Sequence, residues 1–140
     1  MRAFEFETYQ LPSEALTLRQ EVRDFLSQSI GHYSISEKAK SWVGFDANFS
    51  AQLGKNGWLG MTWPKPFGSA RSSLERYVVI EELLAFGAPV AAHWIAERQS
   101  GPLILRFGTE DQKNLYLPGI SKGETFFCIG MSEPGSGSDL

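Results

Sequence analysis

The residues best suited to chemistry in this sequence form a Gly/Ser-rich run near its end, residues 131–139, which reads MSEPGSGSD. Pro134 fixes one backbone torsion, while Gly135 and Gly137 can adopt torsions that other residues avoid. Successive backbone N–H groups can then converge into a concave nest that holds an anion such as a pyrophosphate. Serine hydroxyls, that of Ser138 among them, add further donors. The pattern therefore predicts an anion-binding loop.

An apolar segment rich in β-formers, residues 125–131, leads into this loop and predicts a strand buried on both faces. At its end, the backbone N–H of Met131 and the hydroxyl of Ser132 are suited to bond the polar edge of a flat heterocycle. One strand cannot satisfy its own N–H and C=O groups. We therefore expect the rest of the sheet to come from residues after Leu140 or from another chain, and the sequence to be a truncated piece of a larger protein.

Helical periodicity and capping signals dominate the chain before this strand. The predicted fold is mainly α, with about six helices, followed by the first strand of a truncated β-domain. Residues 1–123 are predicted as a helical domain and residues 124–140 as the start of the β-domain. Between two helices, the segment 57–68 mixes Pro, Gly and large aromatics and predicts a packed loop. The expected helices span residues 13–31, 46–54, 72–87, 90–99, 102–107 and 109–117.

The predicted helix 72–87 is the most apolar of the set. Its polar residues Ser72, Glu75 and Glu82 fall in one narrow stripe, which predicts a central helix with neighbours on several sides. Glu81 lies off that stripe. It is therefore a candidate buried carboxylate that needs an arginine or a backbone partner, as in a structural ion pair.

Charge and composition exclude several classes of protein. The 140 residues carry 16 acidic and 13 scattered basic side chains, so neither a nucleic-acid footprint nor a polybasic membrane patch is visible. The lone Cys128 is expected to be a small buried hydrophobe, and His32 and His93 lack the spacing of metal ligands. The uncharged run 83–95 is too short to span a bilayer, and no apolar secretory core follows Met1. We expect a cytoplasmic protein with no metal site and no membrane insertion.

The terminal run closely resembles the signature of the acyl-CoA dehydrogenase family, in which a strand ends in an apolar, Ser or Thr, Glu-Pro-Gly, small, Gly-Ser-Asp sequence. The resemblance extends from about residue 16 to residue 140. Further matches to the family follow in the same order along the chain: Gly57-Trp58-Leu59-Gly60 with Trp63-Pro64, Glu81-Glu82-Leu83, Gly101-Pro102, Phe107-Gly108-Thr109-Glu110 with Gln112-Lys113, Tyr116-Leu117-Pro118 and Gly123-Glu124.

The resemblance implies FAD as cofactor, bound between the middle β-domain and a C-terminal helical bundle. By its motif, Ile129, Met131 and Ser132 correspond to positions near the flavin ring. Gly137 and Ser138 correspond to positions near the FAD pyrophosphate, and Ser138 also to one near the pantetheine of the thioester substrate.

The resemblance also places His93 and Arg98 on a helix that in relatives faces the acyl end of the substrate pocket. Glu133 and Asp139 are expected to shape the loop rather than to transfer protons. The implied partners are an acyl-CoA substrate, an electron-transfer protein as acceptor, and further subunits of a homo- or hetero-oligomer.

The family's reaction removes the α-proton of an acyl thioester while a hydride leaves the β-carbon for FAD. No residue of this chain matches the catalytic base, so no catalytic residue is named, and the chain alone is expected to be inactive and to bind FAD weakly or not at all. Two alternatives stay open. One is a non-catalytic helical subunit that pairs with a second chain, and the other is an acyl-CoA oxidase or flavin monooxygenase of the same fold.

Overall fold

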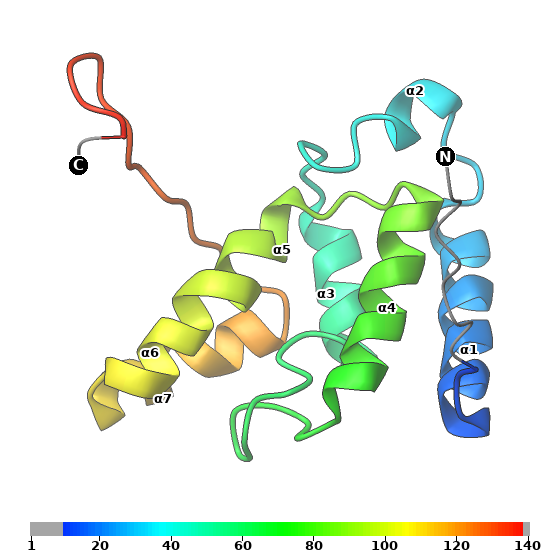
Figure 1. Ribbon diagram of the computed structural model, residues 1–140, viewed down its shortest axis with the longest axis horizontal. Coiled ribbons are helices and arrows are strands. Elements are labelled where there is room, and N and C mark those ends of the chain that lie inside the picture. Colours follow the sequence, from blue (N-terminus) through cyan, green and yellow to red (C-terminus); the bar gives the residue numbers. More distant parts are fainter. Residues whose placement is uncertain (1–9, 139–140) are drawn as a thin grey trace, which may run out of the picture.

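The computed structural model describes residues 10–138 of the chain. The described part is mainly helical, as predicted, and Figure 1 shows the helices gathered into one body from which the C-terminal segment departs. The elements are α1 (Ser13–Ile30), α2 (Ile35–Lys38), α3 (Ala47–Lys55), α4 (Ser73–Phe86), α5 (Ala91–Ile95), the π-helical turn η1 (Ala96–Ser100), α6 (Gly101–Phe107) and α7 (Glu110–Ser121).

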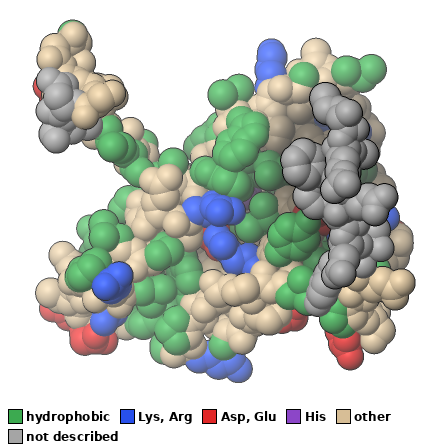
Figure 2. Space-filling view, in the orientation of Figure 1, with side chains coloured by type: hydrophobic (Ala, Val, Ile, Leu, Met, Phe, Trp, Pro, Cys, Tyr) green, Lys and Arg blue, Asp and Glu red, His purple; other side chains and the backbone are tan. Residues whose placement is uncertain are grey.

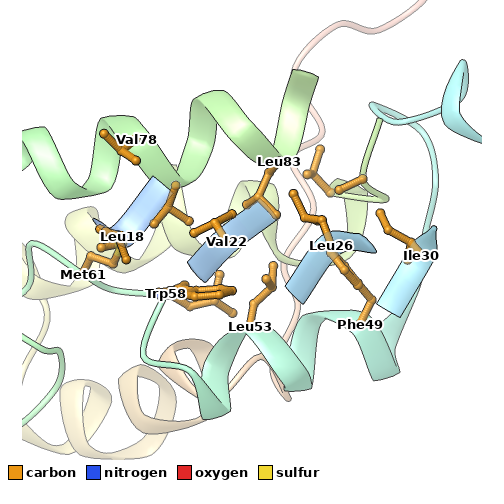
Figure 3. Packing of buried hydrophobic residues seen from close by; sticks show 14 of the residues in the cluster. Leu18, Val22, Leu26, Ile30, Phe49, Leu53, Trp58, Met61, Val78 and Leu83 are labelled. Carbon is orange, nitrogen blue, oxygen red and sulfur yellow. The ribbon is translucent and has the colours of Figure 1, made fainter. Parts of the chain in front are cut away.

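The main core lies between α1, α3 and α4 (Figure 3). Leu18, Val22 and Leu26 recur at helical spacing along α1, and all three are buried. The predicted packed loop closes the core, because Trp58 and Met61 lie buried beneath α1 and α4. The sequence expectation of a buried aromatic loop at 57–68 is thereby confirmed.

Ion pairs join α1 to α4 at the edge of this core. Glu82 Oε2 lies 2.7 Å from Arg23 Nε, and Glu82 Oε1 lies 2.9 Å from Arg19 Nε. Arg19 also pairs with Glu81, which accepts a hydrogen bond of 2.7 Å from the hydroxyl of Tyr77. The predicted arginine partner of Glu81 is confirmed, but the assignment of burial was wrong. Glu82 is the buried carboxylate, at 7% exposure, because it lies at the contact between α4 and α1, whereas Ser72 of the same stripe is exposed.

The segment 91–107 is one continuous rod made of α5, η1 and α6, so the helix break predicted at Gly101-Pro102 was wrong. Proline has no N–H to donate, and the wider π turn just before Pro102 leaves room for its ring. Gly101 is needed for packing, because a Cβ there would lie 2.2 Å from the Trp63 ring.

A second, smaller core lies between the rod and α7, and its fully enclosed members are Trp63, Ala96, Leu117 and Ile120. α7 runs on to Ser121, so the end predicted at Pro118 was also wrong. Burial of Leu117 and Ile120 on either side of the proline holds the last turn in place despite its missing N–H.

The strand predicted at 125–131 does not form in the described part of the chain, where the one β-bridge joins Glu133 to Ser136. A strand needs a neighbour to pair its N–H and C=O groups, and the helical body offers no sheet edge. The segment instead leaves the body beyond Phe127, as the orange to red ribbon in Figure 1 shows.

Candidate functional site

The candidate anion-binding loop is a tight turn at the tip of the departing segment. The N–H of Glu133 donates to the carbonyl of Ser136 (2.7 Å), and the N–H of Ser136 donates back to the carbonyl of Glu133 (3.1 Å). Pro134 and Gly135 stand at the corner, and a Cβ at Gly135 would meet nothing within 4 Å. The turn is therefore open on its outer side, and two of the amides expected in the nest are used within it.

The residues that the signature assigns to the cofactor lie along this segment. Ile129 is 46% and Met131 62% exposed, and Ser132 and Ser138 are exposed too. Cys128 is exposed as well, so the expectation that it is a buried hydrophobe was wrong. The reason is shared by all of these residues: no other described part of the chain covers the segment after Phe127.

His93 lies inside the helical body rather than on a ligand-facing surface. Its side chain is 4% exposed, and its Nδ1 shares a hydrogen bond of 2.8 Å with the Oγ of the fully buried Ser50 on α3. Burial lowers the pKa of His93 from its ordinary 6.5 to about 4, because the charged ring would lose its hydration. The imidazole is therefore neutral at pH 7 and ties α5 to α3.

Arg98 lies on another face of the rod, five residues on. Its guanidinium covers the ring of Trp94 at 4.5 Å, and Trp94 in turn packs edge-on against Trp42 at 4.5 Å between ring centroids. Arg98 also lines a groove of about 430 Å³ between α4 and the rod, together with Tyr77 and Ile80. The structure thus separates the two residues that the sequence grouped, with His93 in the core and Arg98 at an open groove.

Sequence reasoning missed a second buried ion pair that borders the same groove. The carboxylate of Glu97, 6% exposed, lies 3.1 Å from Arg76 Nη2 on α4. The sequence carried one indication of this pair, because Glu97 follows His93 by four residues and therefore lies on the same face of the helix. Since His93 lies in the core, Glu97 on the same face is buried too.

Residues 10–138 contain no group of three or more His, Cys, Asp or Glu side chains placed to hold a metal ion. None of the helices in this range combines the length and the apolar character needed to cross a membrane.

Comparison with known proteins assigns the family. The family profile described as "Acyl-CoA dehydrogenase, N-terminal domain" matches residues 12–124. The chain belongs to the acyl-CoA dehydrogenase family. That match includes His93 and Arg98 and ends before Ile129, so the cofactor assignments at 129–138 rest on the signature alone and stay predictions.

Individual relatives and solved structures agree with the profile. FadE26 of Mycobacterium tuberculosis is 35% identical over 127 residues, which cover 90% of this chain and 30% of FadE26. The ChsE4-ChsE5 complex from the same species superposes with a TM-score of 0.77 at 32% identity, covering 95% of this chain and 34% of that one. An acyl-CoA dehydrogenase from Bacillus anthracis complexed with FAD gives a TM-score of 0.65 at 25% identity, covering 92% and 22%. The chain therefore spans about a third or less of the length of the relatives it matches.

Proposed function

We propose that this chain is the N-terminal part of a flavin-dependent acyl-CoA dehydrogenase, in which residues 1–123 form the helical domain and residues 124–140 begin the β-domain. The observation that carries the proposal is the family match over 12–124 together with the signature run at 131–139, which begins a few residues after it. The complete protein would oxidise the Cα–Cβ bond of an acyl-CoA thioester. No residue of this chain matches the family's catalytic base, so we infer that the chain alone is inactive.

The residues present are compatible with part of an FAD site. Ile129 and Met131 offer exposed apolar side chains to one face of a ring, and Ser132 offers a hydroxyl and a backbone N–H. Open space around Gly135 and Gly137 lets a pyrophosphate approach the backbone there, with Ser138 beside it. When bound, the flavin accepts the hydride from the β-carbon of the substrate. The role of this chain is then to bind and orient one edge of the cofactor.

The three residues assigned to the substrate would act in different ways. Ser138 would contact the pantetheine arm, and Arg98 would lie at the acyl end, where the groove beside Tyr77 and Ile80 is open. His93 would not contact the substrate and would act as a positioning residue. Its hydrogen bond to Ser50 holds the first turns of the rod against α3. An electron-transfer protein would reoxidise the flavin, and the complete protein would be oligomeric.

A chimera tests the proposal. Residues 12–138 would replace the matching segment of FadE26, and the purified product would be examined for flavin absorbance and for its bleaching by acyl-CoA. We expect a yellow protein that bleaches, because the segment would supply the helical domain and one edge of the flavin site. FadE26 prepared in the same way is the control. A chimera that folds with the helix content of the control but stays colourless would contradict the proposal.

A second candidate is a non-catalytic subunit that pairs with another chain. The exposed apolar side chains of Ile129 and Met131 favour it, because a partner could cover them as well as a later part of the same chain could. Co-purification of the 140 residues with a β-rich protein would support this alternative. A well-folded monomer in size-exclusion chromatography would count against it.

A further inference from the structure

The groove between α4 and the rod combines an apolar floor with three charged side chains, one of which has no ion-pair partner among residues 10–138. Ile80, Leu84 and Tyr77 supply the apolar surface, and Arg76, Glu81 and Arg98 supply the charges, in a volume of about 430 Å³. Figure 2 shows basic side chains gathered in the middle of this face of the molecule, with hydrophobic side chains around them. A volume of this size suits a small organic ligand.

Two of the three charges in the groove are neutralised by the protein itself. Arg76 pairs with the buried carboxylate of Glu97 at 3.1 Å. Glu81 pairs with Arg19 and accepts the hydroxyl of Tyr77. These two groups are therefore occupied and offer little net charge to a ligand.

Arg98 is different from the other two. Among residues 10–138 it has no carboxylate within ion-pair distance, and its guanidinium is held over the face of Trp94 at 4.5 Å. Stacking on an aromatic ring restricts the guanidinium without using its N–H donors, which leaves its planar fork available to a carboxylate. The groove thus has an apolar body with a cation on its wall.

We propose that this groove binds the acyl part of a thioester whose far end carries a carboxylate, and that Arg98 binds that carboxylate. That the ligand is a thioester rests on the proposed function. That its far end carries an acid rests on the residues of the groove. Arg98 is exposed, so a plain saturated acyl chain would gain contact with the apolar floor alone. A chain ending in an acid would gain the same contact and would also pair with the Arg98 cation.

Binding of simple probes to the 140-residue chain tests the proposal. Decanoate and decanol share an apolar chain and differ in the charged end. Binding is followed by tryptophan fluorescence, to which Trp94 beneath Arg98 contributes as one of the four tryptophans of the chain. We expect decanoate to bind about fivefold more tightly than decanol, as for a partly exposed charged pair, and Arg98→Gln to remove that preference. Arg106→Gln is the matched control, because Arg106 also lies over an aromatic ring, that of Phe107, but does not line the groove.

Other outcomes overturn the proposal. Equal binding of decanoate and decanol, or a preference that survives Arg98→Gln, would show that the groove does not recognise an acid. Displacement of decanoate by coenzyme A alone would show that Arg98 binds the phosphates of coenzyme A instead of a carboxylate on the acyl chain. Circular dichroism would establish that each variant keeps its helix content. The flavin chimera is an independent measurement, so its failure would reject the proposed function without deciding what the groove binds.

Discussion

The buried His93 side chain, which is hydrogen-bonded to Ser50, makes the stability of the protein depend on pH. Both groups are enclosed, and burial lowers the pKa of His93 to about 4. In the unfolded chain the same imidazole takes up its proton near pH 6.5. Between these two values the unfolded state binds more protons than the folded one, so stability falls as the pH falls.

We predict that the free energy of unfolding loses about 3 kcal/mol from His93 as the pH falls from 7 to 4, since one pKa unit corresponds to about 1.4 kcal/mol. Urea unfolding at a series of pH values would measure the loss. His93→Gln should reduce the slope between pH 6.5 and 4, while His32→Gln, which replaces an exposed histidine, serves as the control. An unchanged slope in the His93 variant would show that its ring is not the group responsible.

The contact between α1 and α4 depends on charge as well as on apolar packing. The core residues Leu18, Val22 and Val78 give these helices a shared buried face, and Glu82 bridges two arginines of α1 at its edge. An enclosed carboxylate is costly unless it is paired, so the arginines are needed wherever Glu82 is kept.

We predict that Glu82→Gln lowers the free energy of unfolding by about 2 kcal/mol, less than for a fully enclosed pair because the side chain of Arg23 is half exposed. Glu110→Gln breaks an ion pair with Lys113 in which Glu110 is largely exposed, and should cost less than about 0.5 kcal/mol. Urea unfolding of the two variants separates them. Equal losses would mean that the α1–α4 bridge contributes no more than a surface pair.

At the scale of the whole molecule, residues 10–138 consist of a helical body and a terminal segment that no other part of this range covers. Phe127 still belongs to the body, since it packs on the second core and against Tyr116 with ring centroids 5.7 Å apart. Ile129 and Met131, a few residues later, contribute apolar surface that faces solvent. Packing therefore ends between Phe127 and Ile129.

We predict that Phe127→Ala lowers the free energy of unfolding by about 1–2 kcal/mol, whereas Ile129→Ala changes it by less than about 0.5 kcal/mol. Thermal or urea unfolding of the 140-residue chain would measure both. In the flavin chimera, Ile129→Ala should lower the free energy of unfolding by more than it does in the 140-residue chain, because a β-domain would cover Ile129. A large loss from Ile129→Ala in the 140-residue chain would contradict this division.

Local features of the chain were predictable because they depend on neighbours in sequence. The starts of α1, α4 and α7 lie where the predicted helix ranges placed them, at Ser13, Ser72 and Thr109. The tight turn around Pro134 and Gly135 also follows from its residues. The roles of the signature residues in binding FAD are still predictions, because the strands that would complete such a site are not among these residues.

Tertiary structure alone decided the features that join distant parts of the chain. Ser50 contacts His93 across 43 positions of the sequence. Helical periodicity could not show that Glu82 faces the arginines of α1. The missing strand and the exposure of Cys128 have the same origin, since a strand and a buried thiol both need partners that sequence pattern cannot supply. Sequence by itself determined where α1, α3, α4 and α7 begin and which family the chain resembles, while the pairing of helix faces, and hence the groove at Arg98, came from packing.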